Sequence, residues 1–299
     1  MTTSSTLDRQ LEHVTAGGQL TTPELTILTA APDILPLGML ADVVRRRIHG
    51  TQTTYLRVAT HACEQPDVDA IPSGAQEVRI VGTPTSLEAA TVAVQKVRAA
   101  AGDRVVSGFS WGDVDRVAAV AGLPVSRALA MLHSAGLEAL VDVPLDAIAD
   151  AGHVVNCLMG AGFRQLRLTI EKAPAADRQT LIERASVLQA QYGSIQAMSP
   201  LPTVLHAFRP TTGYDDVKAV AIARVAAPNI PTIQVDWLRY GPKLAQVALA
   251  FGADDLDMVS ASDDAPEGRR RAPLESVRRN VEAAGLSPAE RDGHFNVVT

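Results

Sequence analysis

The chain has 299 residues, of which 46% are hydrophobic and 20% charged, and its formal net charge is −6. This balance is typical of a soluble globular protein and excludes a disordered or fibrous chain. Aromatic residues make up only 4%. Because nucleic-acid partners need basic surface and stacking rings, no nucleic acid is expected to bind.

Cysteine content and the polar first residues predict a reduced, cytoplasmic protein. There are two cysteines, Cys63 and Cys157, and no apolar leader in the first six residues. The longest stretch without a charge is Ser186–Phe208, but it contains Pro200 and Pro202. That pattern is typical of a helix end, a turn and a strand, so no membrane span is expected.

The first part of the chain is predicted to be helical. Asp8–His13 has helical composition and is stopped by Gly17 and Gly18, and a second helix runs from Pro36 to just before Gly50. We therefore predict an N-terminal helical extension over residues 1–50 and a single α/β barrel domain over residues 51–299, which includes a C-terminal helix and tail.

Short apolar strands then alternate with helices. The predicted strands are Thr54–Ala59, Glu77–Gly82, Arg104–Ser110, Ala139–Pro144, Gln165–Glu171, Ser194–Leu201, Thr232–Leu238 and Leu256–Val259. The predicted helices are Ser86–Ala101, Asp113–Ala121, Ser126–Ala135 with Ser126 as its N-cap, Val154–Ala161, Ala175–Tyr192, Asp215–Ala227, Pro242–Phe251 and Leu274–Ala284. Strands joined by such crossovers run parallel. The pattern favours a (β/α)8 TIM-type barrel, with an open doubly wound sheet as the alternative.

Three carboxylates are predicted at the carboxyl ends of buried strands, where parallel barrels keep their functional residues. They are Asp142, Glu171 and Asp236. A buried charge needs a partner or a ligand, and two readings remain open. In one, the carboxylates act on a small substrate, with Glu171 or Asp236 as general base and an arginine as anion clamp. In the other, they pair with nearby arginines, such as Arg57, Arg167, Arg209 and Arg239.

Other polar residues follow the predicted strands. His61 and His206 are candidates for acid–base work, although a histidine on a loop is more often solvated. Ser110, Arg209 and Arg239 complete the predicted substrate-binding set. The spacings HxH, HExxH and CxxC are absent, so no metal site is predicted. The turn after the second strand, at Gly82 and Thr83, could hold a phosphate at a helix N-terminus, but it lacks the P-loop and GxGxxG spacings, so a plain capped turn is the favoured reading.

Two segments resemble a known family. They are residues 209–225, RPTTGYDDVKAVAIARV, and residues 229–257, NIPTIQVDWLRYGPKLAQVALAFGADDLD. Both are similar to the radical S-adenosylmethionine (SAM) enzymes of futalosine-dependent menaquinone biosynthesis. These enzymes are aminofutalosine synthase and dehypoxanthine futalosine cyclase, which in turn are similar to the deazaflavin-cofactor synthases.

The resemblance implies a (β/α)8 barrel with substrate and SAM at the strand ends. It also implies a [4Fe–4S] cluster held by a CxxxCxxC loop after the first strand. The matching stretch here, Val58–Pro66, contains Cys63 alone. The family's paired glycines after the second strand match only Gly82, with Thr83 in place of the second. These two positions are the ones that the resemblance assigns to cofactor binding.

These departures from the family lead us to expect a barrel without a cluster, another cofactor or radical activity. Such a protein would bind a small molecule at the carboxyl face of the barrel, or pair with an active paralogue or another copy of itself. The alternative is a repurposed non-radical lyase or hydrolase that acts on a futalosine-like or aromatic carboxylate substrate. A third reading is a radical enzyme that borrows its cluster from a partner chain.

Overall fold

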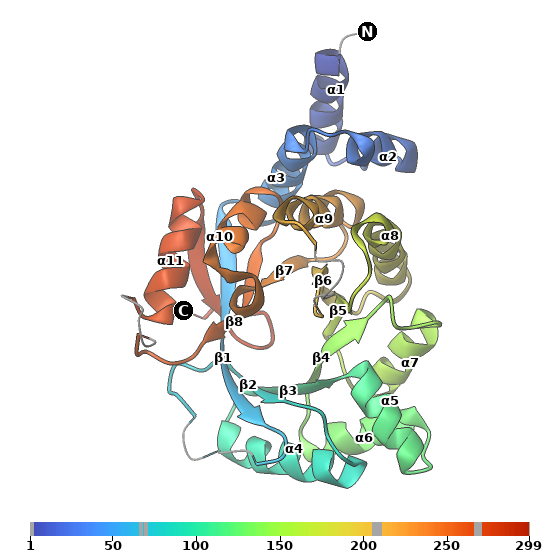
Figure 1. Cartoon of the computed structure of the whole chain (residues 1–299), viewed down its shortest axis with the longest axis vertical. Coiled ribbons are helices and arrows are strands. Elements are labelled where there is room, and N and C mark those ends of the chain that lie inside the picture. Colours follow the sequence, from blue (N-terminus) through green and yellow to red (C-terminus); the bar gives the residue numbers. More distant parts are fainter. Residues whose placement is uncertain (1–2, 66–67, 69–70, 205–210, 266–270, 299) are drawn as a thin grey trace.

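Strand β1 (Gln52–Ala62) closes the sheet on itself. Its one edge pairs in parallel with β8 and its other edge with β2, so the strands β1 to β8 form a closed barrel (Figure 1). The other barrel strands are β2 Glu77–Val81, β3 Val105–Ser110, β4 Ala139–Pro144, β5 Leu166–Ile170, β6 Ile195–Pro202, β7 Thr232–Asp236 and β8 Asp255–Ser260. The predicted TIM-type barrel is confirmed, and the open sheet is not formed. This computed structural model describes residues 3–65, 68, 71–204, 211–265 and 271–298.

Helices surround the barrel, and their starts are set by caps. They are α4 Leu87–Ala101, α5 Trp111–Val120, α6 Val125–Ala135, α7 Ala151–Ala161, α8 Ala175–Tyr192, α9 Gly213–Ala226, α10 Trp237–Ala250 and α11 Pro273–Ala283. Ser86 caps α4 through the backbone N–H of Ala89. Ser126 is not the N-cap of α6, because Pro124 takes that position and Ser126 lies inside the helix. The described residues between β1 and β2 form no helix, so the connection from β1 to β2 departs from the predicted alternation of strands and helices.

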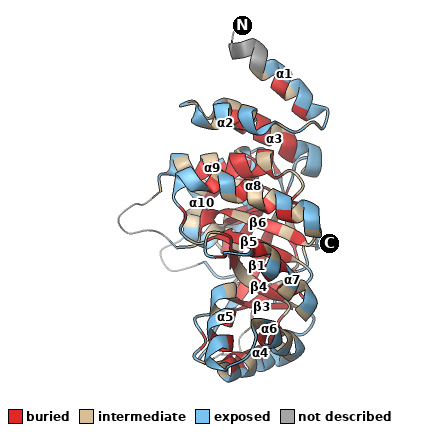
Figure 2. Ribbon diagram, turned by 90° about the vertical axis from the view of Figure 1, so that its right-hand side faces the viewer, coloured by how far each residue is buried: buried red, intermediate tan, exposed pale blue. Residues whose placement is uncertain are grey.

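The N-terminal helices extend beyond the barrel. They are α1 Thr3–Thr15, α2 Thr22–Ala30 and α3 Leu35–His49. Figures 1 and 2 show α1 projecting away from the barrel, α2 lying beside the barrel helices, and α3 leading the chain into the barrel. Thr29 of α2 donates a hydrogen bond of 2.9 Å to Gln179 of α8. Sequence patterns did not predict α2, although Thr21 and Glu24 form a reciprocal capping box at its start. The second predicted helix is confirmed as α3, which ends at Gly50.

One strand was not predicted. After α11, the chain forms β9 (Ser287–Arg291), which pairs in parallel with the first half of β1, from Gln52 to Leu56. The second half of β1, from Val58 to Ala62, pairs with β2. The two neighbours therefore share one edge of β1, and β9 occupies the amino-terminal end of the barrel.

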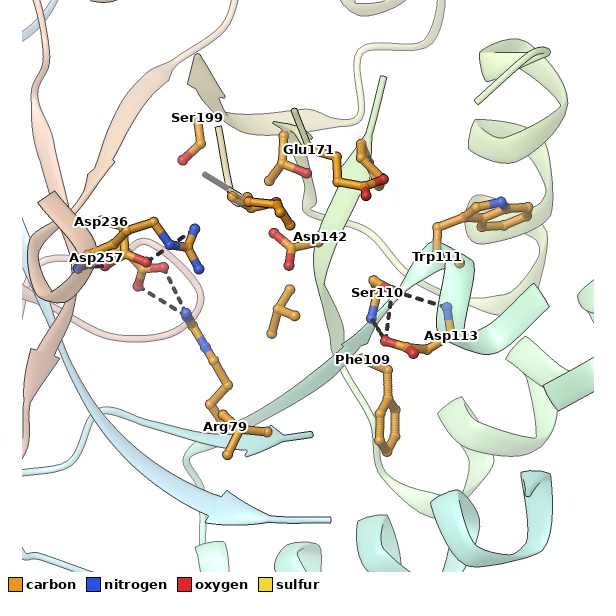
Figure 3. A pocket seen from close by; sticks show the side chains of 18 of the residues that line it. Arg79, Phe109, Ser110, Trp111, Asp113, Asp142, Glu171, Ser199, Asp236 and Asp257 are labelled. Carbon is orange, nitrogen blue, oxygen red and sulfur yellow. Dashed lines mark hydrogen bonds and ion pairs between the residues drawn. The ribbon is translucent and has the colours of Figure 1, made fainter. Parts of the chain in front are cut away.

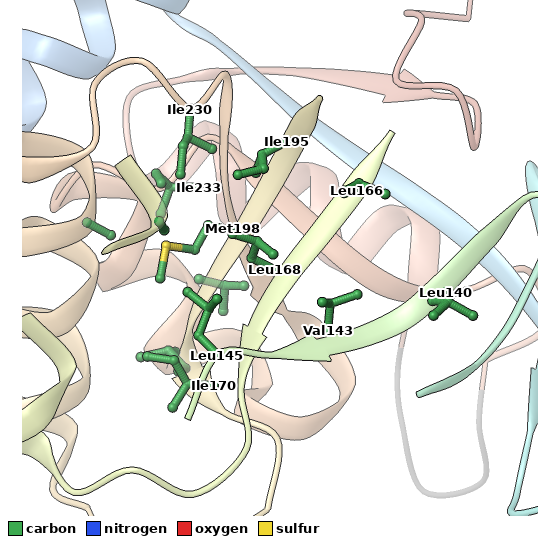
Figure 4. Close-up of a cluster of buried hydrophobic side chains, with 14 of the residues drawn as sticks. Leu140, Val143, Leu145, Leu166, Leu168, Ile170, Ile195, Met198, Ile230 and Ile233 are labelled. Atoms are coloured by element: carbon green, nitrogen blue, oxygen red, sulfur yellow. The ribbon is translucent and has the colours of Figure 1, made fainter. Parts of the chain in front are cut away.

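The apolar core lies between strands and helices, whereas the barrel interior is largely polar. Leu166, Leu168 and Ile170 on β5 face the helices and belong to one buried apolar cluster (Figure 4). Their neighbours Arg167 and Thr169 alternate to the interior, where Arg167 reaches Glu77 of β2. The strands, predicted as short apolar runs, are therefore apolar toward the helices and carry polar side chains toward the interior. In the described part of the chain, only the bent pair α5 and α6 together, and no single helix, reaches the length and hydropathy of a membrane span.

Candidate functional site

A cavity of about 630 Å³ opens at the carboxyl ends of the barrel strands. Figure 3 shows carboxylates from several strands pointing into it. Seven of the ten predicted site residues line it: Gly82, Thr83, Ser110, Asp142, Glu171, Asp236 and Arg239. The expectation that functional residues lie at the carboxyl ends of the strands therefore located the cavity correctly. The roles assigned to these residues stay predictions.

Three of the ten lie elsewhere. His61 does not line the cavity; it is 7% exposed on β1, and its Nε2 has no hydrogen-bond partner among the described residues. It lies four residues after Arg57, on the same face of the strand, and the side chain of Arg57 leaves the barrel toward Asp263. His206 and Arg209 lie outside the described residues.

Asp142 is half-buried and projects into the cavity from β4 (Figure 3). Its carboxyl group has no hydrogen-bond donor among the described residues. Burial raises the pKa of Asp142, and the carboxylates of Asp257 and Asp236 raise it further, while Arg239 and Arg79 oppose the shift. A carboxyl group in this state can accept a proton or bind a donor from a ligand.

Asp236 ends β7 and begins α10, because its carboxylate accepts a hydrogen bond of 2.8 Å from the backbone N–H of Arg239. The predicted strand through Leu238 is therefore too long. The guanidinium of Arg239 lies 3.7 Å from the same carboxylate. Burial nevertheless raises the pKa of Asp236. Glu171 is more exposed and pairs at 3.1 Å with Lys172.

Of the described arginines in the reading that has them neutralise these carboxylates, Arg239 is the one that lies beside one of the three, Asp236, while Arg209 is outside the described residues. Arg57 pairs with Asp263 and Arg167 with Glu77, so neither reaches Asp142, Glu171 or Asp236. The reason is that successive side chains on a strand point to opposite faces. Arg57 therefore points out of the barrel, and Arg167 lies in the barrel interior below the cavity.

The floor of the cavity is an ionic network that the sequence analysis missed. Arg79 donates to both oxygens of Asp257 at 2.8 and 3.0 Å and to Glu77 at 2.6 Å. Arg167 donates to the other oxygen of Glu77 at 2.6 Å. Burial alone would raise the pKa of Glu77, but the two arginines hold it far below its usual value. The signal available in the sequence was charge at alternate positions of β2.

Backbone strain is also concentrated at the cavity. Among described residues other than glycine, Phe109, Met258 and Phe295 have positive φ, at 58°, 60° and 65°. Phe109 and Met258 both line the cavity, at the ends of β3 and β8. Such conformations persist where surrounding structure enforces them, and they are frequent at functional sites.

Ser110, Gly82 and Thr83 form the rim next to α5. The Ser110 hydroxyl donates to Asp113 at 2.7 Å and accepts from the Asp113 backbone at 3.0 Å, so it serves a capping box. Gly82 has φ +94°, and the space where a Cβ would lie is open. Backbone of this kind allows a ligand to approach closely.

The cysteines do not fit a [4Fe–4S] site that binds SAM, which needs three thiolates from one loop. Cys63 is 6% exposed after β1, lies outside the lining of the main cavity, and burial raises the pKa of its thiol. Cys157 lies on α7 with its sulfur 3.4 Å from His153 Nε2. The described residues contain no group of three His, Cys, Asp or Glu side chains that could hold a metal ion.

Comparisons with known proteins define the class first. The fold matches the [FeFe]-hydrogenase maturase HydG with a TM-score of 0.66 and 14% identity, over 96% of this chain and 76% of that one. It matches methylornithine synthase (PylB) with a TM-score of 0.66 and 15% identity, over 96% of this chain and 98% of that one. The barrel therefore has the fold of the radical-SAM enzymes.

Sequence comparisons then define the relationship. Residues 196–299 match the family described as CofH/MqnC C-terminal region. A 5-amino-6-(D-ribitylamino)uracil–L-tyrosine 4-hydroxyphenyl transferase of Methanosarcina barkeri is 27% identical, over 77% of this chain and 70% of its own length. Aminodeoxyfutalosine synthase of Thermus thermophilus is 24% identical, over 64% of this chain and 60% of its own length. The chain is thus related to the CofH/MqnC family of radical-SAM proteins, which confirms the resemblance seen in its sequence.

Proposed function

We propose that this protein is a small-molecule-binding barrel, related to CofH and MqnC, that carries no iron–sulfur cluster of its own and performs no radical chemistry. The observation that supports this proposal is the cysteine set. Cys63 is the single cysteine near the end of β1, and its thiol is buried away from the main cavity. A barrel that cannot assemble three thiolates in one place cannot present the open iron that binds SAM.

The cavity supports a binding role. It has retained a volume of about 630 Å³ and convergent polar groups from most of the barrel strands, which is the size and character of a small-molecule site. In this proposal the ligand occupies the carboxyl face of the barrel. An active paralogue or a second copy of the chain remains a candidate partner at that face.

A second candidate function is polar acid–base catalysis on a futalosine-like or aromatic carboxylate substrate. It is favoured by the raised pKa values of Asp142 and Asp236 in the same cavity, since paired carboxyl groups with shifted pKa values serve as general acids and bases. In this reading Asp142 or Asp236 exchanges the proton, and Arg239 orients the substrate.

The proposal is tested by anaerobic reconstitution of the full chain with iron and sulfide, followed by iron analysis and electron paramagnetic resonance after reduction. We expect no stoichiometric four-iron centre. A matched variant, Cys63→Ser, should retain as much adventitious iron as the unmodified chain. Four irons per chain that disappear in Cys63→Ser would contradict the proposal and favour the radical reading.

A further inference from the structure

We propose that the cavity selects an organic cation, namely a protonated amine on an apolar body that carries no carboxylate. This inference rests on the proposed small-molecule role and specifies the class of ligand. It comes from the charge balance of the cavity lining, from a buried hydroxyl without a partner, and from the apolar character of the remaining wall.

The described lining is strongly acidic. It carries two guanidiniums, Arg79 and Arg239, against six carboxylates: Asp113, Asp115, Asp142, Glu171, Asp236 and Asp257. Lys172 pairs with Glu171 at 3.1 Å and Arg116 lies 3.9 Å from Asp113, so when all are ionised an excess of two negative charges remains. A concave wall of one sign raises the local concentration of ligands of the opposite sign.

Both guanidiniums of the described lining already face carboxylates, although Arg79 is held far more tightly than Arg239. Arg79 is bound on both sides, by Glu77 and by both oxygens of Asp257. Arg239 faces the carboxylate of Asp236 at 3.7 Å. An anionic or zwitterionic ligand would therefore bring another negative charge to Asp142 or Asp236, with Arg239 alone among the described lining residues placed to neutralise it.

Thr169 provides an independent indication of a ligand. It lies on β5 in register with Pro144 of β4, two residues beyond Asp142, and it lines the cavity at 4% exposure. Its hydroxyl has no hydrogen-bond partner among the described residues. A buried hydroxyl without a partner is costly, and a ligand N–H pointing at it would remove that cost.

The rest of the wall suits an apolar ligand body. Ile80, Phe109, Trp111, Leu201 and Met258 contribute to the lining between the carboxylates and the rim. Figure 3 shows Phe109 and Trp111 on the β3 side and Asp236 and Asp257 on the opposite side, with Asp142 between them. A ligand with its ammonium group at Asp142 and Asp236 would lay its body against the aromatic side.

The test compares three probes that share one ring and differ in charge. They are 4-fluorophenethylamine, 4-fluorophenylalanine and 3-(4-fluorophenyl)propionate, and binding to the full chain is measured by ¹⁹F NMR. We expect the amine to bind at least about tenfold more tightly than either carboxylate-bearing probe, the scale of one lost charged contact. Equal or tighter binding of the propionate would overturn the inference, as would no binding by any probe.

Variants assign the effect to the cavity. Asp142→Asn should weaken amine binding by about tenfold, because it removes the charge and keeps the shape. The control Asp103→Asn removes one negative charge from an exposed position before β3, at the other end of the barrel, and should leave binding unchanged. Thr169→Val should weaken binding without loss of thermal stability. An amine affinity unchanged in Asp142→Asn would overturn the inference.

The outcomes separate this inference from the proposed function. If the propionate binds and its binding is lost in Asp236→Asn, the cavity is a small-molecule site but does not select an organic cation. Iron stoichiometry tests the cluster-less proposal independently of any probe. Circular dichroism melting of each variant establishes that a loss of binding is not a loss of fold.

Discussion

Glu77 is the most heavily paired carboxylate inside the barrel, and its substitution gives the sharpest prediction for a single residue. Glu77→Gln leaves Arg79 and Arg167 without their shared anion and should lower the free energy of unfolding by about 3–5 kcal/mol. Glu171→Gln breaks a pair with the exposed Lys172 and should cost less than about 1 kcal/mol. Urea unfolding of both variants measures the difference, and equal losses would contradict the network.

The lowered pKa of Glu77 also determines how its contribution to the free energy of unfolding changes with pH. The unfolded chain binds a proton at Glu77 before the native chain does, so the native ion pairs stabilise the fold above the unfolded pKa of about 4.3. This stabilisation is lost as the pH falls below that value. It is absent at every pH in Glu77→Gln.

Asp142 should behave in the opposite way. Because burial, Asp257 and Asp236 raise its pKa, against Arg239 and Arg79, its ionised form is unfavourable in the native state. Stability should therefore increase as the pH falls through the raised pKa. We expect Asp142→Asn to melt at a higher temperature than the unmodified chain near pH 7.5, with a smaller gain near about pH 5. A constant difference at both pH values would contradict the raised pKa.

Residues at the site were predictable to the extent that they follow a strand. Asp142 and Asp236 were found because a carboxylate at the end of an apolar run is unusual. Arg79 and Thr169 were missed because the strands were treated as apolar runs and candidates were taken from the residues at their ends. His61 was misplaced for a related reason, since a shift of one residue along a strand moves a side chain to the other face.

At the scale of elements, two glycines offer a matched test of how α3 docks. A Cβ on Gly38 would lie 2.5 Å from the ring of Phe251 at the end of α10, whereas a Cβ on Gly160 of α7 meets open space. Gly38→Ala should therefore destabilise the protein by about 1–3 kcal/mol through overpacking. Gly160→Ala should stabilise it by about 0.4–1 kcal/mol, because alanine restricts the unfolded chain. Chemical denaturation measures both, and a stabilised Gly38→Ala would show that α3 is not packed there.

Elements with their own periodicity were predicted well, and elements made by tertiary contacts were not. The long amphipathic helices and the barrel strands carry the pattern in their sequence. Strand β9 does not, because it includes Pro288 and three polar residues and exists through its pairing with β1. The start of α6 was misassigned because Pro124 takes the N-cap position two residues earlier than the predicted cap, Ser126.

At the scale of the whole molecule, the predicted boundary at residue 50 can be tested by truncation. Leu37, Leu40 and Ala41 of α3 have 0% exposure, so α3 is part of the packed barrel. Among the described side chains of α1 and α2, the buried apolar ones are Val14 and Leu25. Removal of residues 1–33 should leave one cooperative unfolding transition, and removal of residues 1–50 should abolish it. Calorimetry distinguishes the two. A cooperative transition in the shorter fragment would instead support the boundary at residue 50.

The barrel architecture was predictable because eight strands in strict alternation with long crossovers leave few topologies. The charged interior was not predictable, because the free-energy cost of burying each charge is offset only by partners that come from distant parts of the chain. Asp255 of β8, for example, receives two hydrogen bonds from Arg291 of β9, at 2.6 and 2.8 Å.

The pairing of β9 with β1 affects how the protein is made. The ribosome delivers residues 287–298 only after every strand of the barrel has been synthesised. Until that moment Arg167 lacks the carbonyl of Gly293, Asp255 lacks Arg291, and the first half of β1 has an open edge. The open edge of β1 and these arginine contacts are consequently completed only by the segment that follows the eighth barrel strand.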